Sequence, residues 1–335
     1  MRSIQTQSTF PLSSVKPLEK LAPYREQCLE ATRRACGGKT RRRERSPATW
    51  AALEPAGRVE ELEYSRCPQT GSLFLTVLPE PGAWSKLLRE AAQFRRSPEA
   101  FHQGLVHSRL ENVHRPKLEW IQETLRLQGV SRPRLLEAVT PPSELTPFLR
   151  EDACFSEVLT ADEMELAHGA VKGLGVESVQ AAALLESLDR VDEPEGLLRE
   201  TARLLCKGGL LFVTGLVGSG FDLAVLALRN RYLYPPDRAN CFTLQGLKGL
   251  LERSGFEAVE VSTPGVLDVQ IVEEHLRADP ELKLPPFEEQ VLASSPEARA
   301  AFQMFLQEWG MSSFARIVAR KSGTGHASGG TFGRA

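Results

Sequence analysis

The sequence predicts an α/β domain with a mostly parallel sheet and helices on both faces, preceded by a small N-terminal module. From residue 134 onward, short apolar segments of strand length alternate with amphipathic segments of helical length. The longest apolar run, residues 210–217, has the length of a buried strand and follows the Gly208-Gly209 turn. No run reaches about 18 apolar residues, so no membrane-spanning helix is expected.

The chain divides into four parts. Residues 1–58 are expected to be a leader and a basic linker, largely disordered or helical. Residues 59–130 contain two short strands around a turn and then a helical region, and residues 131–320 form the α/β domain. The tail, residues 321–335, is rich in Gly and Ser and is expected to be flexible.

The periodicity of the apolar residues places each element. In the helical region, helices are predicted at residues 84–94, 98–107 and 110–127. In the α/β domain, strands are predicted at residues 134–139, 155–159, 177–184, 210–217, 258–262 and 313–319. Helices are predicted at residues 143–150, 162–168, 194–205, 223–229, 243–254 and 287–309.

The composition is that of an ordinary globular protein. The chain has 335 residues and a formal net charge of −2. Its 6 cysteines are too few and too scattered for a disulfide framework in a chain of this length, so a reducing cytoplasm is the expected compartment. The N-terminus is poor in acidic residues and rich in Ser and Thr, and a disordered leader is favoured over organelle targeting.

A basic cluster runs from Arg33 to Arg45. Such a cluster is typical of contact with phosphate or with an acidic partner. No aromatic residue alternates with the arginines, as a stacking site for nucleic acid would require. A solvated linker is therefore the favoured interpretation.

Several segments after Glu177 occur together in one order: LLESLDRVDEPEGLLRETARLLCKGGLLFVTG, GFDLAVL, PPDRANCFT, LLERSGF and TPGVLDVQIV. In this order they resemble class I S-adenosylmethionine-dependent methyltransferases, in particular the branch that carries a cysteine-bearing N-terminal module and often acts in sugar or polysaccharide modification. The resemblance covers roughly residues 60–275. It implies a Rossmann-like fold with a seven-stranded sheet, in which S-adenosylmethionine lies across the carboxyl ends of the strands.

The first cofactor motif of the family is eroded in this chain. Relatives read approximately L-L-D-x-G-x-G-x-G, and the same register here gives Leu135-Leu136-Glu137-Ala138-Val139-Thr140-Pro141-Pro142-Ser143. The acidic position persists as Glu137, but all the glycines that let the backbone approach the cofactor are lost. If a cofactor is bound, the resemblance implies that Glu137, Thr140 and Ser143 contact it.

Two further cofactor positions are altered. After the second strand, relatives place a ribose-binding carboxylate, but here the acids Asp162 and Glu163 lie further downstream. A helix N-terminus capped by Thr160 or Asp162 is the favoured interpretation of this segment. At the fourth strand, the family's E-H-L becomes Glu186-Ser187-Leu188, which keeps the acid and loses the histidine. Asp162 and Glu186 complete the candidate cofactor residues.

The resemblance suggests three candidate catalytic residues: Asp189, Asp237 and Asn240. For Asp189, an exposed loop carboxylate is the favoured interpretation over an acid-base role. The neighbouring Arg238 cannot act as a general base, because its guanidinium stays protonated.

No metal is expected. Relatives use Cys-x-x-Cys pairs to bind zinc, whereas the turn here is Cys67-Pro-Gln-Thr70-Gly, with threonine at the second ligand position. His102, His107 and His114 have spacings that suit an exposed helix face.

Two functions fit these residues. The favoured one is a protein with the methyltransferase fold that has lost or weakened cofactor binding and acts as a scaffold or regulatory partner, bound to another protein or to its own copies. The alternative is an active S-adenosylmethionine-dependent methyltransferase on a small-molecule or sugar-type substrate.

Overall fold

The computed structural model describes residues 10–95, 103–141 and 143–322. Part of the helix predicted at residues 98–107, and Pro142 of the cofactor loop, lie outside these ranges. None of the described helices is long and apolar enough to cross a membrane.

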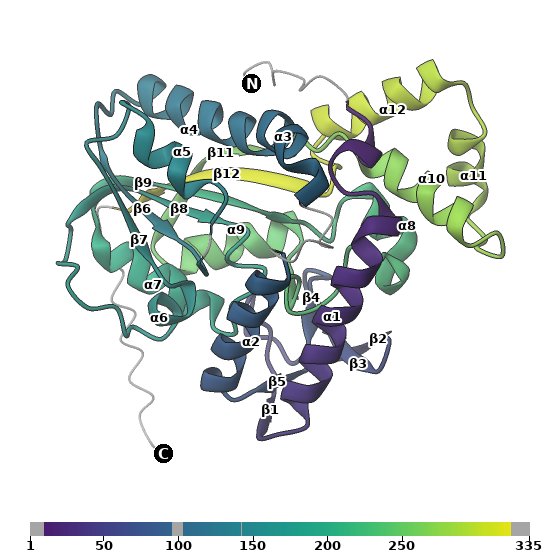
Figure 1. Ribbon diagram of the computed structural model, residues 1–335, viewed down its shortest axis with the longest axis horizontal. Helices are drawn as coiled ribbons and strands as arrows, with labels where there is room; N and C mark the ends of the chain where they lie inside the picture. Colours follow the sequence, from purple (N-terminus) through teal and green to yellow (C-terminus); the bar gives the residue numbers. More distant parts are fainter. Residues whose placement is uncertain (1–9, 96–102, 142, 323–335) are drawn as a thin grey trace.

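The N-terminal module packs two helices against two small antiparallel sheets (Figure 1). Its elements are η1 (Leu12–Ser14), α1 (Leu18–Cys36), β1 (Thr40–Arg42), β2 (Glu54–Val59), β3 (Leu62–Arg66), β4 (Leu73–Leu75), β5 (Val77–Pro79) and α2 (Pro81–Phe94). One sheet pairs β1 with β5, and the other has the order β10-β4-β3-β2. Strand β1 and all of β2 except Val59 lie within residues 1–58, where the sequence indicated only a leader and a linker, largely disordered or helical.

A six-stranded sheet forms the centre of the second part of the chain. The elements are η2 (Gln103–Leu105), α3 (Val106–Arg109), η3 (Leu110–His114), α4 (Arg115–Leu127), β6 (Arg134–Ala138), α5 (Thr146–Glu151), β7 (Glu157–Ala161), α6 (Glu163–Ala167), β8 (Val179–Leu185), α7 (Pro194–Leu204), β9 (Leu205–Leu216), α8 (Phe221–Leu226), η4 (Ala227–Arg229), β10 (Asn240–Cys241), α9 (Leu244–Arg253), β11 (Phe256–Ser262), α10 (Asp268–Ala278), α11 (Pro286–Leu292), α12 (Pro296–Glu308) and β12 (Phe314–Lys321).

The strand order of this sheet is β11-β12-β9-β8-β6-β7. Strands β7, β6, β8 and β9 are parallel, and β12 runs antiparallel to both β9 and β11. The predicted mostly parallel α/β fold is thereby confirmed. The described residues give six strands where the resemblance implied seven, because the connection between β7 and β8 contains only the short helix α6.

Alternate residues of each strand point to opposite faces, and each face has its own apolar layer. On β9, Leu210 and Phe212 pack toward α4 and α5, and Trp120 of α4 meets Phe212 edge to face with ring centroids 5.3 Å apart. Leu211 and Val213 pack on the other face, which α7 and α9 cover. These two layers hold the parallel strands rigidly at the base of the site.

The N-terminal module shares a core with the α/β domain. Strand β10 joins the module's sheet through the pairs Asn240 with Phe74 and Cys241 with Leu73. Phe242 then meets Phe74 edge to face, with centroids 5.3 Å apart. The end of the segment from Tyr232 to Asn240 is therefore fixed between the two parts.

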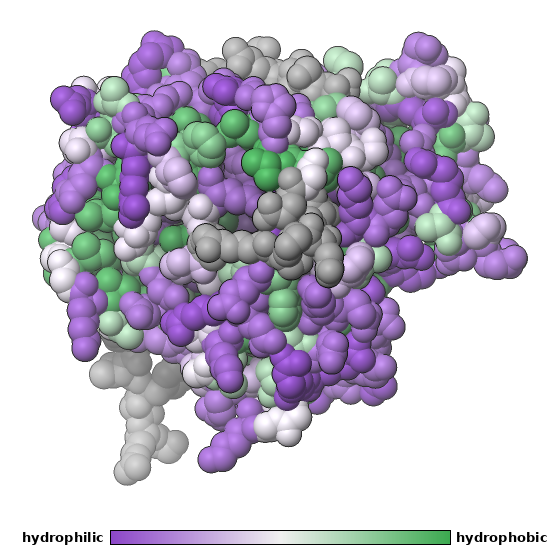
Figure 2. Space-filling view, viewed as in Figure 1, coloured by the Kyte–Doolittle hydropathy of each residue, from purple (hydrophilic) through white to green (hydrophobic). Residues whose placement is uncertain are grey.

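Helices α10, α11 and α12 form an arm at the right of Figure 1. The sequence did not predict α10, and the helix predicted at 287–309 is two helices, because Pro296 starts α12 with Ser295 as its N-cap. On α12, Gln303 and Gln307 are buried beside Leu306, while Met304 and the C-cap Trp309 are 51% and 62% exposed. Figure 2 shows hydrophilic side chains over most of the N-terminal module on the same face of the molecule.

We expect Gln303→Leu to lower the free energy of unfolding by about 2 kcal/mol although it makes a buried residue apolar. The Gln303 amide donates to Gly265 O and to Asp268 Oδ2 at 2.9 Å each, and its oxygen accepts from Val269 N at 3.0 Å. All three partners would lose a hydrogen bond. Met304→Gln, on the exposed face of the same helix, should change stability by less than about 0.5 kcal/mol in urea unfolding. Equal losses in the two variants would contradict the described docking of α12.

Candidate functional site

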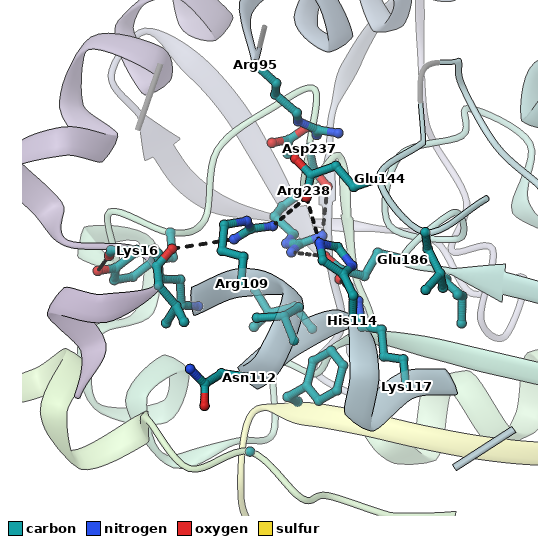
Figure 3. Close-up of a pocket in the computed structure, with 18 of the residues that line it drawn as sticks. Lys16, Arg95, Arg109, Asn112, His114, Lys117, Glu144, Glu186, Asp237 and Arg238 are labelled. Carbon is teal, nitrogen blue, oxygen red and sulfur yellow. Dashed lines mark hydrogen bonds and ion pairs between the residues drawn. The ribbon is translucent and has the colours of Figure 1, made fainter. Parts of the chain in front are cut away.

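A cavity of about 510 Å³ lies where β6, β8 and β9 end. Ala138 and Val139 after β6, Glu186 after β8 and Leu216 at the end of β9 form its floor. Two segments distant in sequence close it: residues 10–16 before α1, and residues 232–238 before β10. Figure 3 shows charged side chains from the α3–α4 region and from these segments converging in the cavity.

Glu137, the acid of the first cofactor position, is hydrogen-bonded within its own loop. It is 3% exposed, and it accepts from Ser143 Oγ at 3.0 Å and from Thr146 Oγ1 at 2.5 Å. Burial raises the pKa of Glu137, against the opposing effect of these two hydroxyls. Ser143 Oγ also accepts from the Leu145 and Thr146 amides at the start of α5. Both carboxylate oxygens of Glu137 are thus held by side chains of this chain.

Glu163 is the buried acid at the end of β7, and it too is paired internally. Arg190 donates to its two oxygens at 3.2 Å each, and Thr140 Oγ1 donates at 2.6 Å. The side chain is fully buried. Asp162 accepts from the amides of Met164 and Glu165, as expected for an N-cap. Neither acid lines the cavity.

Glu186 faces the cavity and bridges two cations. Lys117 Nζ lies 2.8 Å from one carboxylate oxygen, and Arg238 lies 2.6 Å from the other. Although burial alone raises its pKa, these two charges hold the pKa of Glu186 well below its ordinary value. Its φ of 64° is in the left-handed region, where a residue with a side chain is strained.

The three candidate catalytic residues have different surroundings. Asp237 lines the cavity and pairs with Arg95 and with the Tyr24 hydroxyl at 2.9 Å. Asp189 lies below the floor, where one oxygen accepts from Leu216 N and from Arg238, both at 2.9 Å. Burial raises the pKa of Asp189 to about 7.

Asn240 is fully buried and has a structural set of contacts. Its amide nitrogen donates to Leu188 O and Val191 O, and its oxygen accepts from Arg43 at 2.6 Å. Of the three candidates, only Asp237 lines the cavity, so a direct catalytic role is geometrically open to Asp237 alone.

The arginines of the basic cluster each contact another group of this chain. The partners are Glu26 for Arg33, Glu90 for Arg34, Asp192 and Glu193 for Arg41, Glu63 for Arg42, Asn240 for Arg43 and Trp50 O for Arg45. The Arg33 to Arg45 segment thus belongs to α1, β1 and the loop after it and ties the module to the loop after β8.

The Cys67 turn contains hydroxyls where relatives have zinc ligands. Thr49 Oγ1 lies 3.2 Å from Cys67 Sγ. Burial raises the thiol's pKa, but hydrogen bonds from Ser46, Thr49 and Thr70 outweigh that effect and bring it to about 7. Among the described residues, no group of three or more His, Cys, Asp or Glu could hold a metal ion.

Several cavity residues were not found from the sequence. Lys16 comes from the segment interpreted as a leader, and Arg109 and Lys117 come from a region noted only for its helical period. No local motif surrounds them. Lys16 reaches the ends of the strands through the packing of the module against the α/β domain, whereas Arg109 and Lys117 reach them because α4 packs on the sheet through Ile121 and Leu125.

Residues 107–261, which include β6 to β9 and the cavity floor, match a family model described as a methyltransferase domain. Residues 107–261 are thus similar to the methyltransferase domain that this model describes, and the match extends over less than half of the chain. No curated protein matches the chain in sequence.

Solved structures similar to the methyltransferase domain include three enzymes of this kind. A Galdieria sulphuraria protein assigned as a sarcosine dimethylglycine methyltransferase is 15% identical, with 64% of this chain and 88% of that chain covered and a TM-score of 0.41. The Burkholderia thailandensis 1,6-didemethyltoxoflavin-N1-methyltransferase was solved with 1,6-didemethyltoxoflavin and S-adenosylhomocysteine. It is 14% identical, with 80% of this chain and 99% of that chain covered and a TM-score of 0.40. An S-adenosylmethionine-dependent methyltransferase from Thermotoga maritima is 18% identical, with 66% of this chain and 96% of that chain covered and a TM-score of 0.38. At these scores the likeness says nothing about the cofactor or substrate of this chain.

Proposed function

We propose that this chain is a methyltransferase-fold protein that no longer binds S-adenosylmethionine in the family's manner and that acts by binding. The observation that carries the proposal is the internal pairing of two buried acids: Glu137, the acid of the first cofactor motif, and Glu163, which follows the second strand of that half of the sheet. Glu137 is held by Ser143 and Thr146, and Glu163 by Arg190 and Thr140. A cofactor would have to displace these partners and bury its own polar groups in their place.

The loop after β6 also fits the cofactor poorly. Relatives use glycines here so that the backbone can approach the cofactor without a Cβ in the way. This chain places Val139 and Thr140 at the cavity wall, and Thr140 is committed to Glu163. The residues present therefore do not match the cofactor, and we assign no methyl-transfer step to this site.

The proposal includes a protein partner or self-association. Support comes from the aromatic face of α12, where Phe305 and Trp309 are 44% and 62% exposed. Large exposed apolar side chains in one patch are typical of interaction surfaces. The cytoplasm is proposed as the compartment because all six cysteines are free thiols.

We expect no binding of S-adenosylmethionine or S-adenosylhomocysteine in calorimetry at about 1 mM ligand. The paired acids and the loop without glycine would hinder the binding of both compounds, because the two would occupy the same positions. We therefore expect neither to bind. An unfolding transition recorded on the same sample serves as the control for a folded protein. Measurable binding of either compound together with methyl transfer would overturn the proposal.

The alternative is an active S-adenosylmethionine-dependent methyltransferase, and one observation favours it. Glu186 has a left-handed backbone conformation at the cavity wall, and strain of this kind clusters at functional sites. S-adenosylhomocysteine recovered from the purified protein by mass spectrometry would support this alternative over the first proposal.

A further inference from the structure

We propose that the cavity binds a small molecule with an apolar body and an anionic head, a carboxylate or a phosphate, and that Lys16 binds the anionic group. This inference deepens the proposed function and rests on it for the location of ligand binding. The inference depends on Lys16 and Arg316, two cavity residues outside the candidate cofactor positions.

Cationic side chains outnumber carboxylates in the wall of the cavity. The cations are Lys16, Arg95, Arg109, Lys117, Arg190, Arg238 and Arg316, and the carboxyl groups are Glu137, Glu144, Glu186, Asp237 and Asp268. Burial raises the pKa of Glu137, and burial together with the nearby charge of Asp222 raises that of Asp268 to about 6. These two acids therefore compensate less positive charge than their number suggests.

Most of the cations already have a carboxylate. Lys117 and Arg238 share Glu186, Arg95 pairs with Asp237, and Arg109 pairs with Glu144. Arg190 pairs with Glu163 behind the wall. The excess of charge is thus confined to Lys16 and Arg316.

Lys16 has no ion-pair partner among the residues that the structure describes. Its ammonium lies 4.5 Å from the ring centroid of Tyr232, a cation–π contact that leaves its N–H donors free. Burial lowers the pKa of Lys16, while Asp222, Glu186 and Asp268 attract the charge without contacting it and Arg238 repels it. A buried cation without a counter-ion is costly, and an anion in the cavity would supply one.

Arg316 is the second cation in this condition. Its guanidinium lies over Trp120, 5.5 Å from the ring centroid, and its buried Nε has no hydrogen-bond partner. Its pKa is lowered to about 10, chiefly by burial. Two unpaired cations in one cavity favour an anionic ligand over a neutral or cationic one.

The rest of the wall fits an apolar body. Aromatic and aliphatic side chains alternate with the charges: Tyr24, Leu185, Leu216, Tyr232, Ile271 and Phe314. A volume of about 510 Å³ is typical of sites for small molecules. The cavity therefore suits a metabolite-sized acid and not a polymer.

Four naphthalene compounds of nearly equal size test this inference on the full chain: naphthoate, naphthyl phosphate, naphthalenemethanol and naphthylmethylamine. In calorimetry at neutral pH, we expect the two anions to bind and the amine not to bind. The ratio of the two anion affinities tells whether a carboxylate or a phosphate is preferred. Lys16→Met should weaken anion binding by at least roughly tenfold, which is the effect of losing one charged hydrogen bond.

Two variants serve as controls. Lys20→Met removes an exposed lysine that does not line the cavity and should leave anion binding unchanged. Lys16→Arg keeps the charge and should retain binding within a few-fold. If Lys16→Met fails to fold, Lys16→Gln removes the charge with a polar side chain.

Equal affinity for the alcohol and the anions would overturn the inference, and so would unchanged anion binding in a folded Lys16→Met or Lys16→Gln variant. Its failure is distinguishable from failure of the proposed function. Binding of S-adenosylmethionine with charge-selective binding of naphthoate would reject the proposed function alone. Absence of both would reject the anion site alone.

Discussion

Replacing Arg238 with methionine is expected to lower the free energy of unfolding by about 3 to 5 kcal/mol. Arg238 pairs with Glu186 at 2.6 Å and with Asp189 at 2.9 Å. Its guanidinium side chain is only 19% exposed. Without it, Glu186 would keep only Lys117, and Asp189 would lose the charged donor that accompanies Leu216 N.

Urea unfolding measures this loss. Arg58→Met is the matched control, because Arg58 is 63% exposed and pairs with the exposed Glu63, so its loss should cost less than about 1 kcal/mol. Similar stabilities for the two variants would show that the buried charge network does not hold the floor of the cavity.

Asp189 is expected to contribute a loss of stability as the pH rises from about 4 to about 7, and Asp189→Asn should remove that contribution. Burial raises the pKa of Asp189 from 3.8 to about 7 in the folded protein. Within this window the folded state keeps a proton that the unfolded state has released, so rising pH favours unfolding. The shift corresponds to roughly 4 kcal/mol across the window.

The measurement is the free energy of unfolding in urea at several pH values. Asp279→Asn, at an exposed position on the arm, should show the same pH dependence as the unaltered protein. If Asp189→Asn left the pH dependence of the free energy of unfolding unchanged, another group would be responsible for it. Asp268, whose pKa is raised to about 6, would then be the next to replace.

The periodicity of the apolar residues predicted the strands and helices that short-range sequence determines. Phe212 lies in the middle of the strand that the sequence predicts at residues 210–217, and in the structure it is fully buried in β9. The alternation of strands and helices after residue 134 is confirmed, because each strand is covered by helices that neighbour it in sequence. The helix α10 was missed because Asp268, Gly265 and Gln303 position it through contacts between distant segments.

The candidate site was harder to predict for the same reason. The erosion of the glycine loop was readable, since each glycine has a fixed place in the motif. The partners of Glu163 were not, because Arg190 comes from the loop after β8 and Thr140 from the loop after β6. Lys16 reaches the cavity only through the packing of the module, which no local pattern encodes.

The position of β12 has a consequence for the synthesis of the chain. This strand comes after every other element of the sheet, yet it lies between β9 and β11 and bonds to both. On the ribosome, β9 and β11 therefore emerge with open edges and cannot be joined until residues 314–321 have followed them. The six-stranded sheet can reach its native order only after β12 has left the ribosome, and a messenger truncated before β12 would yield a product with two exposed strand edges.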